Sequence, residues 1–176
     1  EFMTERGYRI ATGDNEMNIV YIEGMGVNFQ KNSDEPNKWN DLSIIIKFVK
    51  GTPYLYYLAK CTTEPGLGAT ISKAARLLGG VARIAFGQHL SCWRVGLHHP
   101  TRNPSHPALV QCGPVKVHRD YNRDMKRTND PISLARGLNQ HGTWPGYRGE
   151  NVDHNSAGCL VRQVWDDHLA FIETIK

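Results

Sequence analysis

The class of fold is set by LSIIIKFV at residues 42–49 and YLYYLAKC at residues 54–61, two runs rich in β-branched and aromatic residues. The segment between them, KGTP at residues 50–53, is turn-forming, so the two runs predict a β-hairpin. Shorter runs of the same kind predict further strands at residues 18–23, 81–86, 92–97 and 108–118, the last one broken near Gly113 and Pro114.

The other segments differ in pattern from these strands. The apolar residues Trp165, Leu169, Ile172 and Ile175 follow helical spacing, and they predict a helix over residues 165–175. A shorter helical segment is expected at residues 71–78, and polar or proline-rich loops are expected at residues 28–40, 98–107 and 120–131. We therefore expect a mainly β fold in one domain, a β-sandwich or bent barrel with a C-terminal α-helix.

Composition excludes several classes of protein. Of the 176 residues, 40% are hydrophobic and 22% are charged, which is typical of soluble globular chains and not of disordered ones. The longest apolar run, residues 42–49, contains Ser43 and Lys47 and is far shorter than the roughly 20 residues of a membrane-spanning helix, so no span is expected. The net charge of +4 comes without a basic run, so we expect no nucleic-acid partner.

The four cysteines, Cys61, Cys92, Cys112 and Cys159, form no C-x-x-C pair, which argues against zinc-ribbon and thioredoxin-like sites. A chain of this length can build a core without disulfides. The first twenty residues hold no apolar segment, so no signal peptide is visible and synthesis in the cytoplasm is expected. Glu1 and Phe2 look like a cloning remnant before a start at Met3.

The stretch that could carry chemistry is GLNQHGTWPGYRGENVDHNSAGCLVR, residues 137–162. It combines a thiol with imidazoles, and an imidazole can accept the proton of a cysteine and return it later. Gly158 directly before Cys159 leaves the backbone bare, so a substrate carbonyl can approach and backbone N–H groups can face a developing oxyanion. Ser156 and Ala157 add little bulk to this approach.

This stretch resembles the catalytic motif of the L,D-transpeptidases, which act on bacterial peptidoglycan. His141-Gly142-Thr143 is followed by Ser156-Ala157-Gly158-Cys159, which places the histidine and the cysteine eighteen positions apart, as in that family. Two positions depart from the family pattern: Ala157 stands where the family has a histidine, and Val161 stands where it usually has Arg or Asn, with Arg162 one place further on. The stretch is also similar to a looser group of phage and bacterial Ser-Ala-Gly-Cys proteins suspected of cell-wall cleavage.

The resemblance implies that residues 4–176 form one L,D-transpeptidase-like catalytic domain without a cofactor. Cys159 would be the nucleophile, His141 the general base, and the Gly142 carbonyl would orient the imidazole. The substrate would be a peptidoglycan stem peptide, met at the bacterial cell wall in the periplasm or after export. The thioester would pass to an amine, giving a cross-link, or to water, giving cleavage, and a lytic role is compatible with the second outcome.

Further residues of this stretch are candidates for binding the substrate. Trp144 and Tyr147 could line a groove, although aromatic residues in such a loop as often anchor it to the domain. Arg162 could contact a substrate carboxylate. His154 could replace the missing family histidine, or face solvent in its loop.

Metal sites are weaker predictions. Asp120, Asn122 and Asp124 fall at positions 1, 3 and 5 of a calcium-loop template, but Met125 and Pro131 replace its glycine and glutamate, which favours a salt-bridged turn. A zinc site could be supplied by the central histidines, which are His98, His99, His106 and His118. Against this, no H-E-x-x-H occurs, and adjacent histidines in a strand point to opposite faces. Two alternatives to cysteine chemistry therefore stay open, a metal-dependent cell-wall hydrolase and a non-catalytic cell-wall or phage-particle binding module.

Overall fold

The protein is mainly β, with 35% of residues in strands and 16% in helices, which confirms the expected fold class. The structure, a computed structural model, describes residues 1–99, 101 and 105–176. The larger sheet contains β1 (Asn18–Ile22), β2 (Asp41–Val49), β3 (Thr52–Thr62), β5 (Trp93–His98), β6 (His106–Gln111), β9 (Gln140–Gly142) and β10 (Leu160–Arg162). The smaller sheet contains β4 (Val81–Ile84), β7 (Val115–Asp120) and β8 (Ile132–Ala135). The helical segments are α1 (Phe2–Glu5), α2 (Leu67–Thr70), α3 (Lys73–Leu77), the 3-10 turn η1 (Asp153–Asn155) and α4 (Trp165–Ile175).

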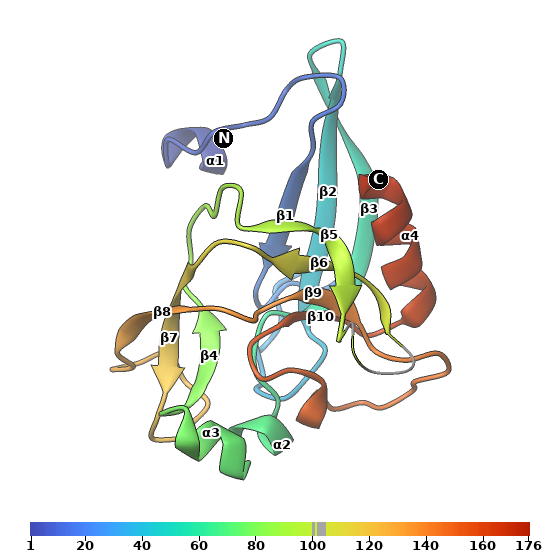
Figure 1. Ribbon diagram of the computed structural model, residues 1–176. Helices are drawn as coiled ribbons and strands as arrows, with labels where there is room; N and C mark the ends of the chain where they lie inside the picture. Colours follow the sequence, from blue (N-terminus) through green and yellow to red (C-terminus); the bar gives the residue numbers. More distant parts are fainter. Residues whose placement is uncertain (100, 102–104) are drawn as a thin grey trace.

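The larger sheet has the strand order β1-β2-β3-β10-β9-β6-β5. Strands β1, β2 and β3 form an antiparallel meander at one end, and the β5–β6 hairpin forms the other end. Strand β10 joins the two ends, because it runs antiparallel to β3 and parallel to β9. The smaller sheet, β4-β7-β8, lies to one side (Figure 1), and neither sheet closes into a barrel.

The predicted hairpin forms as strands β2 and β3, connected by a two-residue turn. Val49 pairs with Thr52, and the two residues between them, Lys50 and Gly51, both have positive φ values of 50° and 78°. Such turns match the right-handed twist of the flanking strands, and glycine at the second position adopts the left-handed conformation without steric cost.

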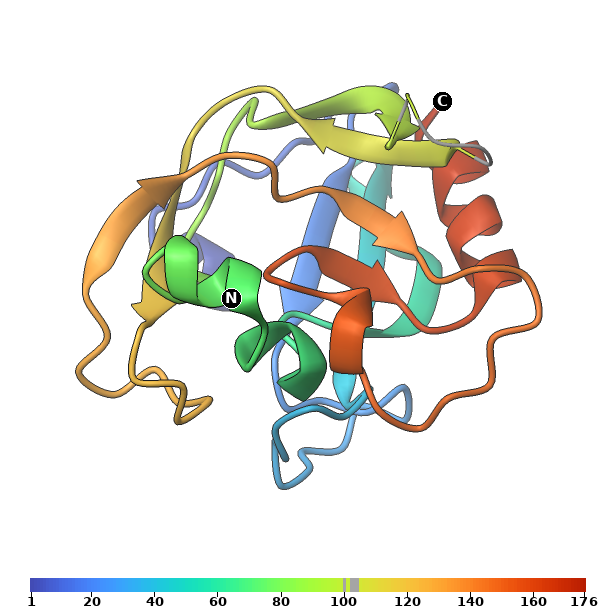
Figure 2. The same ribbon diagram turned by 60° about the horizontal axis from the view of Figure 1, so that its bottom comes forward.

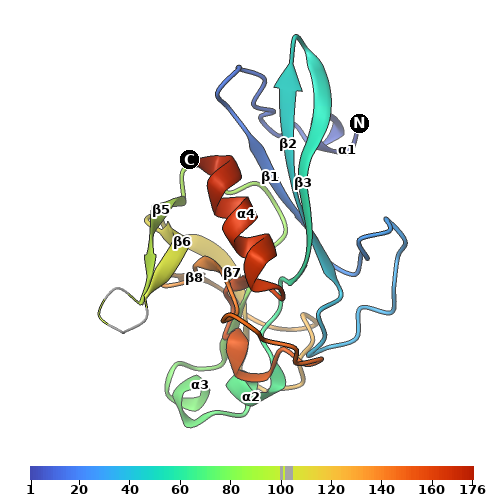
Figure 3. The same ribbon diagram turned by 90° about the vertical axis from the view of Figure 1, so that its right-hand side faces the viewer.

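Helix α4 has the bounds that its apolar spacing predicts, and it packs in the bend of the larger sheet. Figure 3 shows the helix between the β1–β3 meander and the β5–β6 hairpin. The core here combines residues of β2, β3, β6 and α4: Ile45, Tyr57, Ala59, Leu109, Phe171 and Ile172. No helix of the described residues is long and apolar enough to cross a membrane.

Arg162 of β10 belongs to this core, which corrects the prediction that it binds substrate. Its side chain has no exposed surface. One guanidinium nitrogen, Nη2, donates to Tyr21 Oη at 2.7 Å and to Ser43 Oγ at 2.9 Å, and the guanidinium carbon lies 3.2 Å from the centroid of the Phe171 ring. No carboxylate of the described residues forms a salt bridge with it.

The sequence predictions fail mainly at short strands. Strands β8, β9 and β10 have three or four residues each and carry no pattern that distinguishes them from loop. The loop predicted at residues 98–107 is too long, because β5 extends to His98 and β6 begins at His106. Pro100 and Pro104 of that predicted loop lie outside the described residues.

His168 makes the stability of the fold dependent on pH. The side chain is fully buried in α4, its Nε2 lies 2.7 Å from the carbonyl oxygen of Pro107, and burial lowers its pKa to about 4. In the unfolded chain the same imidazole binds a proton near pH 6.5. The contribution of neutral His168 to the free energy of unfolding is therefore fully present above pH 6.5, and roughly 3 kcal/mol of it is lost as the pH falls to 4.

Replacing His168 with glutamine is expected to remove that pH dependence, since the amide can still donate to Pro107 but does not titrate. Denaturant unfolding in metal-free buffer at pH 7 and at pH 4 measures the effect. The variant should be less stable than wild type at pH 7, and the gap should close at pH 4. An unchanged difference in the free energy of unfolding between wild type and His168→Gln would show that His168 does not titrate in this range. The control is His154→Gln, at an exposed position.

Candidate active site

Strands β9 and β10 are neighbours in the larger sheet (Figure 2). His141 lies on β9, and Cys159 comes directly before β10. In their parallel pairing, Val161 lies opposite His141. Cys159 directly precedes β10 and packs in the same apolar cluster as Val161, so it faces the same side of the sheet. Cys159 and His141 are therefore offset by two positions along the strands, about 7 Å.

His141 is buried, with 7% of its surface exposed, and its ring is held by its own strand. Its Nδ1 lies 2.8 Å from the carbonyl oxygen of Gly142, the orienting contact that the sequence predicts. Burial lowers the pKa of His141 to about 3, so the ring is neutral at pH 7. Since Nδ1 donates to Gly142, Nε2 carries the lone pair.

Cys159 is a free thiol of intermediate burial. Its Sγ accepts a hydrogen bond from the Asn139 N–H at 3.4 Å and lies 3.9 Å from the carbonyl oxygen of Gly137. Burial raises the pKa of this thiol to about 11, although the Asn139 N–H opposes the shift. No hydrogen bond among the described residues joins Sγ to His141, and in the free protein both groups are neutral at pH 7.

Ser156 fixes the turn that leads into Cys159. Its hydroxyl donates to the Cys159 carbonyl oxygen at 2.8 Å and accepts from the Gly158 N–H at 3.1 Å. The Gly158 N–H is therefore already used, which corrects the prediction that it faces an oxyanion. The N–H of Cys159 makes no hydrogen bond within the described part of the chain, so it is the backbone donor next to the thiol.

Two neighbouring segments hold this turn in place. The Gly66 N–H donates to the Ser156 carbonyl at 2.9 Å, and the Ala82 N–H of β4 donates to the Ala157 carbonyl at 3.3 Å. Gly158 has a φ of +130°, and a Cβ at this position would lie 2.3 Å from the Ala82 carbonyl oxygen. The glycine thus allows a close approach between the turn and β4 that no other residue permits.

The three remaining candidates for substrate binding lie on the connection between β9 and β10. Tyr147 anchors this connection, because its hydroxyl donates to the Asn151 carbonyl at 2.6 Å and its ring packs edge-on against the buried Trp39. Trp144 is 56% exposed and packs against Tyr147. His154 is exposed in η1 and packs over Gly68 of α2.

Two further histidines gather beside the predicted base, His141. His98 and His106 are paired directly between β5 and β6, and the His98 ring stacks on that of His141 with centroids 3.9 Å apart. The nitrogens of His98, His106 and His141 that could bind a metal lie within 4.8 Å of one another. The sequence analysis had named His98 and His106 as metal candidates without His141, because the strand pairing that joins them was not visible.

The calcium candidate is a turn stabilised by backbone groups. Asp120 accepts hydrogen bonds from the N–H groups of Asp124 and Met125, and Asp124 accepts one from the Lys126 N–H at 2.8 Å. Asn122 donates to Asp124 Oδ2 at 3.1 Å. These contacts correct the expectation of a salt-bridged turn, because the carboxylates accept from backbone groups of the turn and form no salt bridges among the described residues. The calcium candidate stays a prediction.

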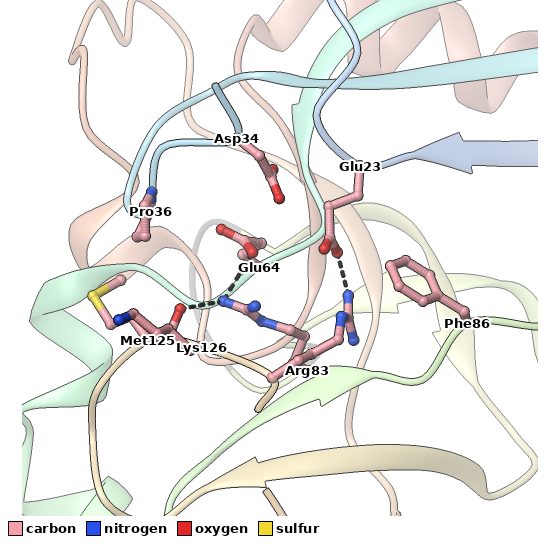
Figure 4. Close-up of a pocket in the computed structure, with 9 residues that line it drawn as sticks. Glu23, Asp34, Pro36, Glu64, Arg83, Phe86, Met125 and Lys126 are labelled. Carbon is pink, nitrogen blue, oxygen red and sulfur yellow. Dashed lines mark hydrogen bonds and ion pairs between the residues drawn. The ribbon is translucent and has the colours of Figure 1, made fainter. Parts of the chain in front are cut away.

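The sequence analysis missed a charged pocket of about 370 Å³ near the same turn (Figure 4). Its charged side chains come from five separate segments: Glu23, Asp34, Glu64, Arg83, Lys126 and Arg127. Arg83 forms a buried salt bridge with Glu64 at 2.8 Å, and Arg127 forms one with Glu23. Burial raises the pKa of Glu64, while Arg83 lowers it.

The pocket lies next to the two residues that hold the turn before Cys159 (the cysteine turn). Glu64 lies two residues before Gly66, and Arg83 directly follows Ala82, the two residues whose N–H groups hold the turn. The one signal in the sequence that could have indicated this pocket is Glu64, a glutamate in the turn that follows the long strand β3.

Comparison with family models, with curated proteins and with solved structures found no match to this chain.

Proposed function

We propose that the protein processes peptidoglycan stem peptides by cysteine acyl transfer. The observation that supports this most is the parallel pairing of β9 and β10, which places Cys159 and His141 on one face of the sheet with the His141 Nδ1 held by Gly142. This arrangement leaves the basic nitrogen of His141 as the proton acceptor for a thiol two positions away along the neighbouring strand.

The pKa values argue against a preformed ion pair of thiolate and imidazolium. Both groups are neutral at pH 7, so the proton of Cys159 moves to His141 Nε2 as the sulfur attacks, and not before. Catalytic hydrogen bonds are often long in a free enzyme and shorten in the complex with substrate. A bound peptide would also displace the Gly137 carbonyl as the contact of the thiol.

The reaction then follows from the groups present. The sulfur forms a bond to an amide carbonyl beside a D-centre, and the Cys159 N–H stabilises the oxyanion. The C–N bond breaks as His141 returns its proton to the leaving amine, which leaves a thioester on Cys159. Water or a second amine attacks this thioester, releases the thiol, and gives cleavage or a cross-link respectively.

The charged pocket supports a peptide that carries both signs of charge. Stem peptides contain free carboxylates, and many also contain a free amine. Lys126 attracts the first and Asp34 attracts the second, since neither forms a salt bridge among the described residues. The pocket adjoins the supports of the cysteine turn, so a peptide could occupy both regions.

Incubation with purified stem peptides of defined length, followed by mass spectrometry, tests the proposal. Shortened products indicate hydrolysis, products joined by an added amine indicate transfer, and a peptide mass added to the protein at Cys159 identifies the thioester. Absence of all three, together with binding of intact peptidoglycan that is the same for wild type and Cys159→Ala, would reject the proposal and leave the binding module.

Lys126→Ala is expected to weaken substrate binding without changing the chemistry. Lys126 is exposed at the edge of the pocket and forms no salt bridge among the described residues. Losing one exposed charge contact should raise KM about two- to fivefold and leave kcat unchanged. Steady-state kinetics with a peptide ending in a free carboxylate measure the effect, and the amidated peptide should show none. A fall in kcat alone would contradict a binding role for the pocket.

A further inference from the structure

We infer that His98, His106 and His141 form a binding site for a divalent transition-metal ion of the Zn²⁺ type, and that the bound ion blocks acyl transfer. The metal site stands on its own geometry, and the blocking effect rests on the proposed function.

The three rings already lie close to a coordinating arrangement. His98 and His106 are opposite each other in the β5–β6 pairing, with ring centroids 5.0 Å apart, and the ring centroids of His106 and His141 are 5.7 Å apart. The ligand nitrogens lie within 4.8 Å of one another. Nitrogens bound to a tetrahedral zinc are about 3.3 Å apart, so the ligand nitrogens have to move by about 1.5 Å or less, through side-chain rotation, to complete the site.

Two of the three nitrogens are ready to bind. His141 directs its Nδ1 to the Gly142 carbonyl, which is the contact that fixes a ligating histidine with Nε2 free for a metal. His106 Nε2 is buried without a hydrogen-bond partner among the described residues. Such a group destabilises the fold unless something satisfies it, and a metal ion does so.

The third histidine already has a hydrogen-bond partner, which metal binding has to displace or reverse. Asn139 Nδ2 lies 2.9 Å from His98 Nδ1, and the orientation of this amide is fixed because Asn139 Oδ1 accepts from the Gln111 N–H at 3.0 Å. A metal at Nδ1 would take the place of the amide proton. A metal at Nε2 would need the proton to sit on Nδ1 instead.

The ligand set selects the class of ion. Imidazole nitrogen suits Zn²⁺ and neighbouring transition metals, whereas Ca²⁺ and Mg²⁺ require oxygen ligands. The cluster contains no carboxylate. Three protein ligands leave a fourth position open on zinc.

The consequence for catalysis follows from His141 belonging to both sites. Its Nε2 lone pair can accept the proton of Cys159 or bind the metal, but not both at once. A bound ion therefore inhibits acyl transfer. This is the opposite of a metal-dependent hydrolase, which needs the ion for activity.

Metal binding is measured first, without reference to activity. Co²⁺ is titrated into the metal-free protein and followed by the visible absorption of tetrahedral cobalt, and Zn²⁺ then competes. Wild type should bind one equivalent, His106→Gln should lose more than about 100-fold in affinity, and His118→Gln, in the other sheet, should match wild type. Equal binding by wild type and His106→Gln, or none by wild type, would overturn the site.

Activity on stem peptides is measured second, on wild type and His106→Gln with Zn²⁺ or with EDTA. Inhibition of wild type by Zn²⁺, reversed by EDTA and absent in His106→Gln, supports the blocking role. Loss of activity with EDTA would overturn it in favour of a metal-dependent hydrolase. Cobalt binding at the histidines with no peptide processing under any condition would uphold the site, overturn the blocking effect and reject the proposed function.

Discussion

Replacing Cys159 with alanine is expected to abolish the processing of stem peptides, with a fall in kcat of at least about 10⁴-fold. Alanine cannot form the thioester, and no other thiol can replace Cys159. Cys61 is fully buried, while Cys92 and Cys112 flank the β5–β6 hairpin and are absent from the apolar cluster around Cys159. The measurement is the initial rate of product formation by mass spectrometry under saturating peptide.

A matched control separates the role of this thiol from that of thiols in general. Cys112 is an exposed free thiol, so Cys112→Ala should retain the wild-type rate. Thermal unfolding of both variants shows whether the fold is intact. Wild-type activity in a folded Cys159→Ala variant would rule out cysteine chemistry.

Gly158→Ala is expected to reduce the free energy of unfolding by about 3–5 kcal/mol. The new methyl group would meet the Ala82 carbonyl at 2.3 Å, and alanine is also strained at a φ of +130°. Relief requires β4 to move away from the turn, which breaks the hydrogen bond from Ala82 to Ala157. Denaturant unfolding measures the loss.

Gly146→Ala is the control, because Gly146 also has a positive φ, of +79°, but a Cβ there meets no atom within 4 Å. It should cost about 1 kcal/mol, from backbone strain alone. Similar losses in the two variants would mean that the close approach of the turn to β4 contributes nothing to stability.

Much of the fold could be predicted from the sequence, because its longest elements carry strong patterns. The β2–β3 hairpin combines two apolar runs with a glycine turn, and α4 combines helical spacing with acidic residues at its start. The short strands β9 and β10 could not be predicted, because three residues show no periodicity and their pairing depends on the rest of the sheet.

The site was predictable only where its chemistry is local in sequence. Gly142 acts on the neighbouring His141, so the motif alone indicated the contact between them. The environment of Arg162 depends on Tyr21, Ser43 and Phe171, which come from three other segments, so a residue that resembled a substrate contact proved to be part of the core. The histidine cluster and the charged pocket were hidden for the same reason.

The position of β10 in the sheet has a consequence for the order of folding. The β1–β3 meander and the β5–β6 hairpin each form from segments close in sequence, and such local contacts form quickly. Strand β10 follows all other strands in the chain, yet it lies between β3 and β9 and connects the two halves of the sheet. As the chain is synthesised, both halves can form before β10 leaves the ribosome. Cys159 and His141 therefore come together only after the other strands of the sheet have been synthesised, and a chain interrupted before β10 lacks the thiol, the strand that joins the two halves and helix α4.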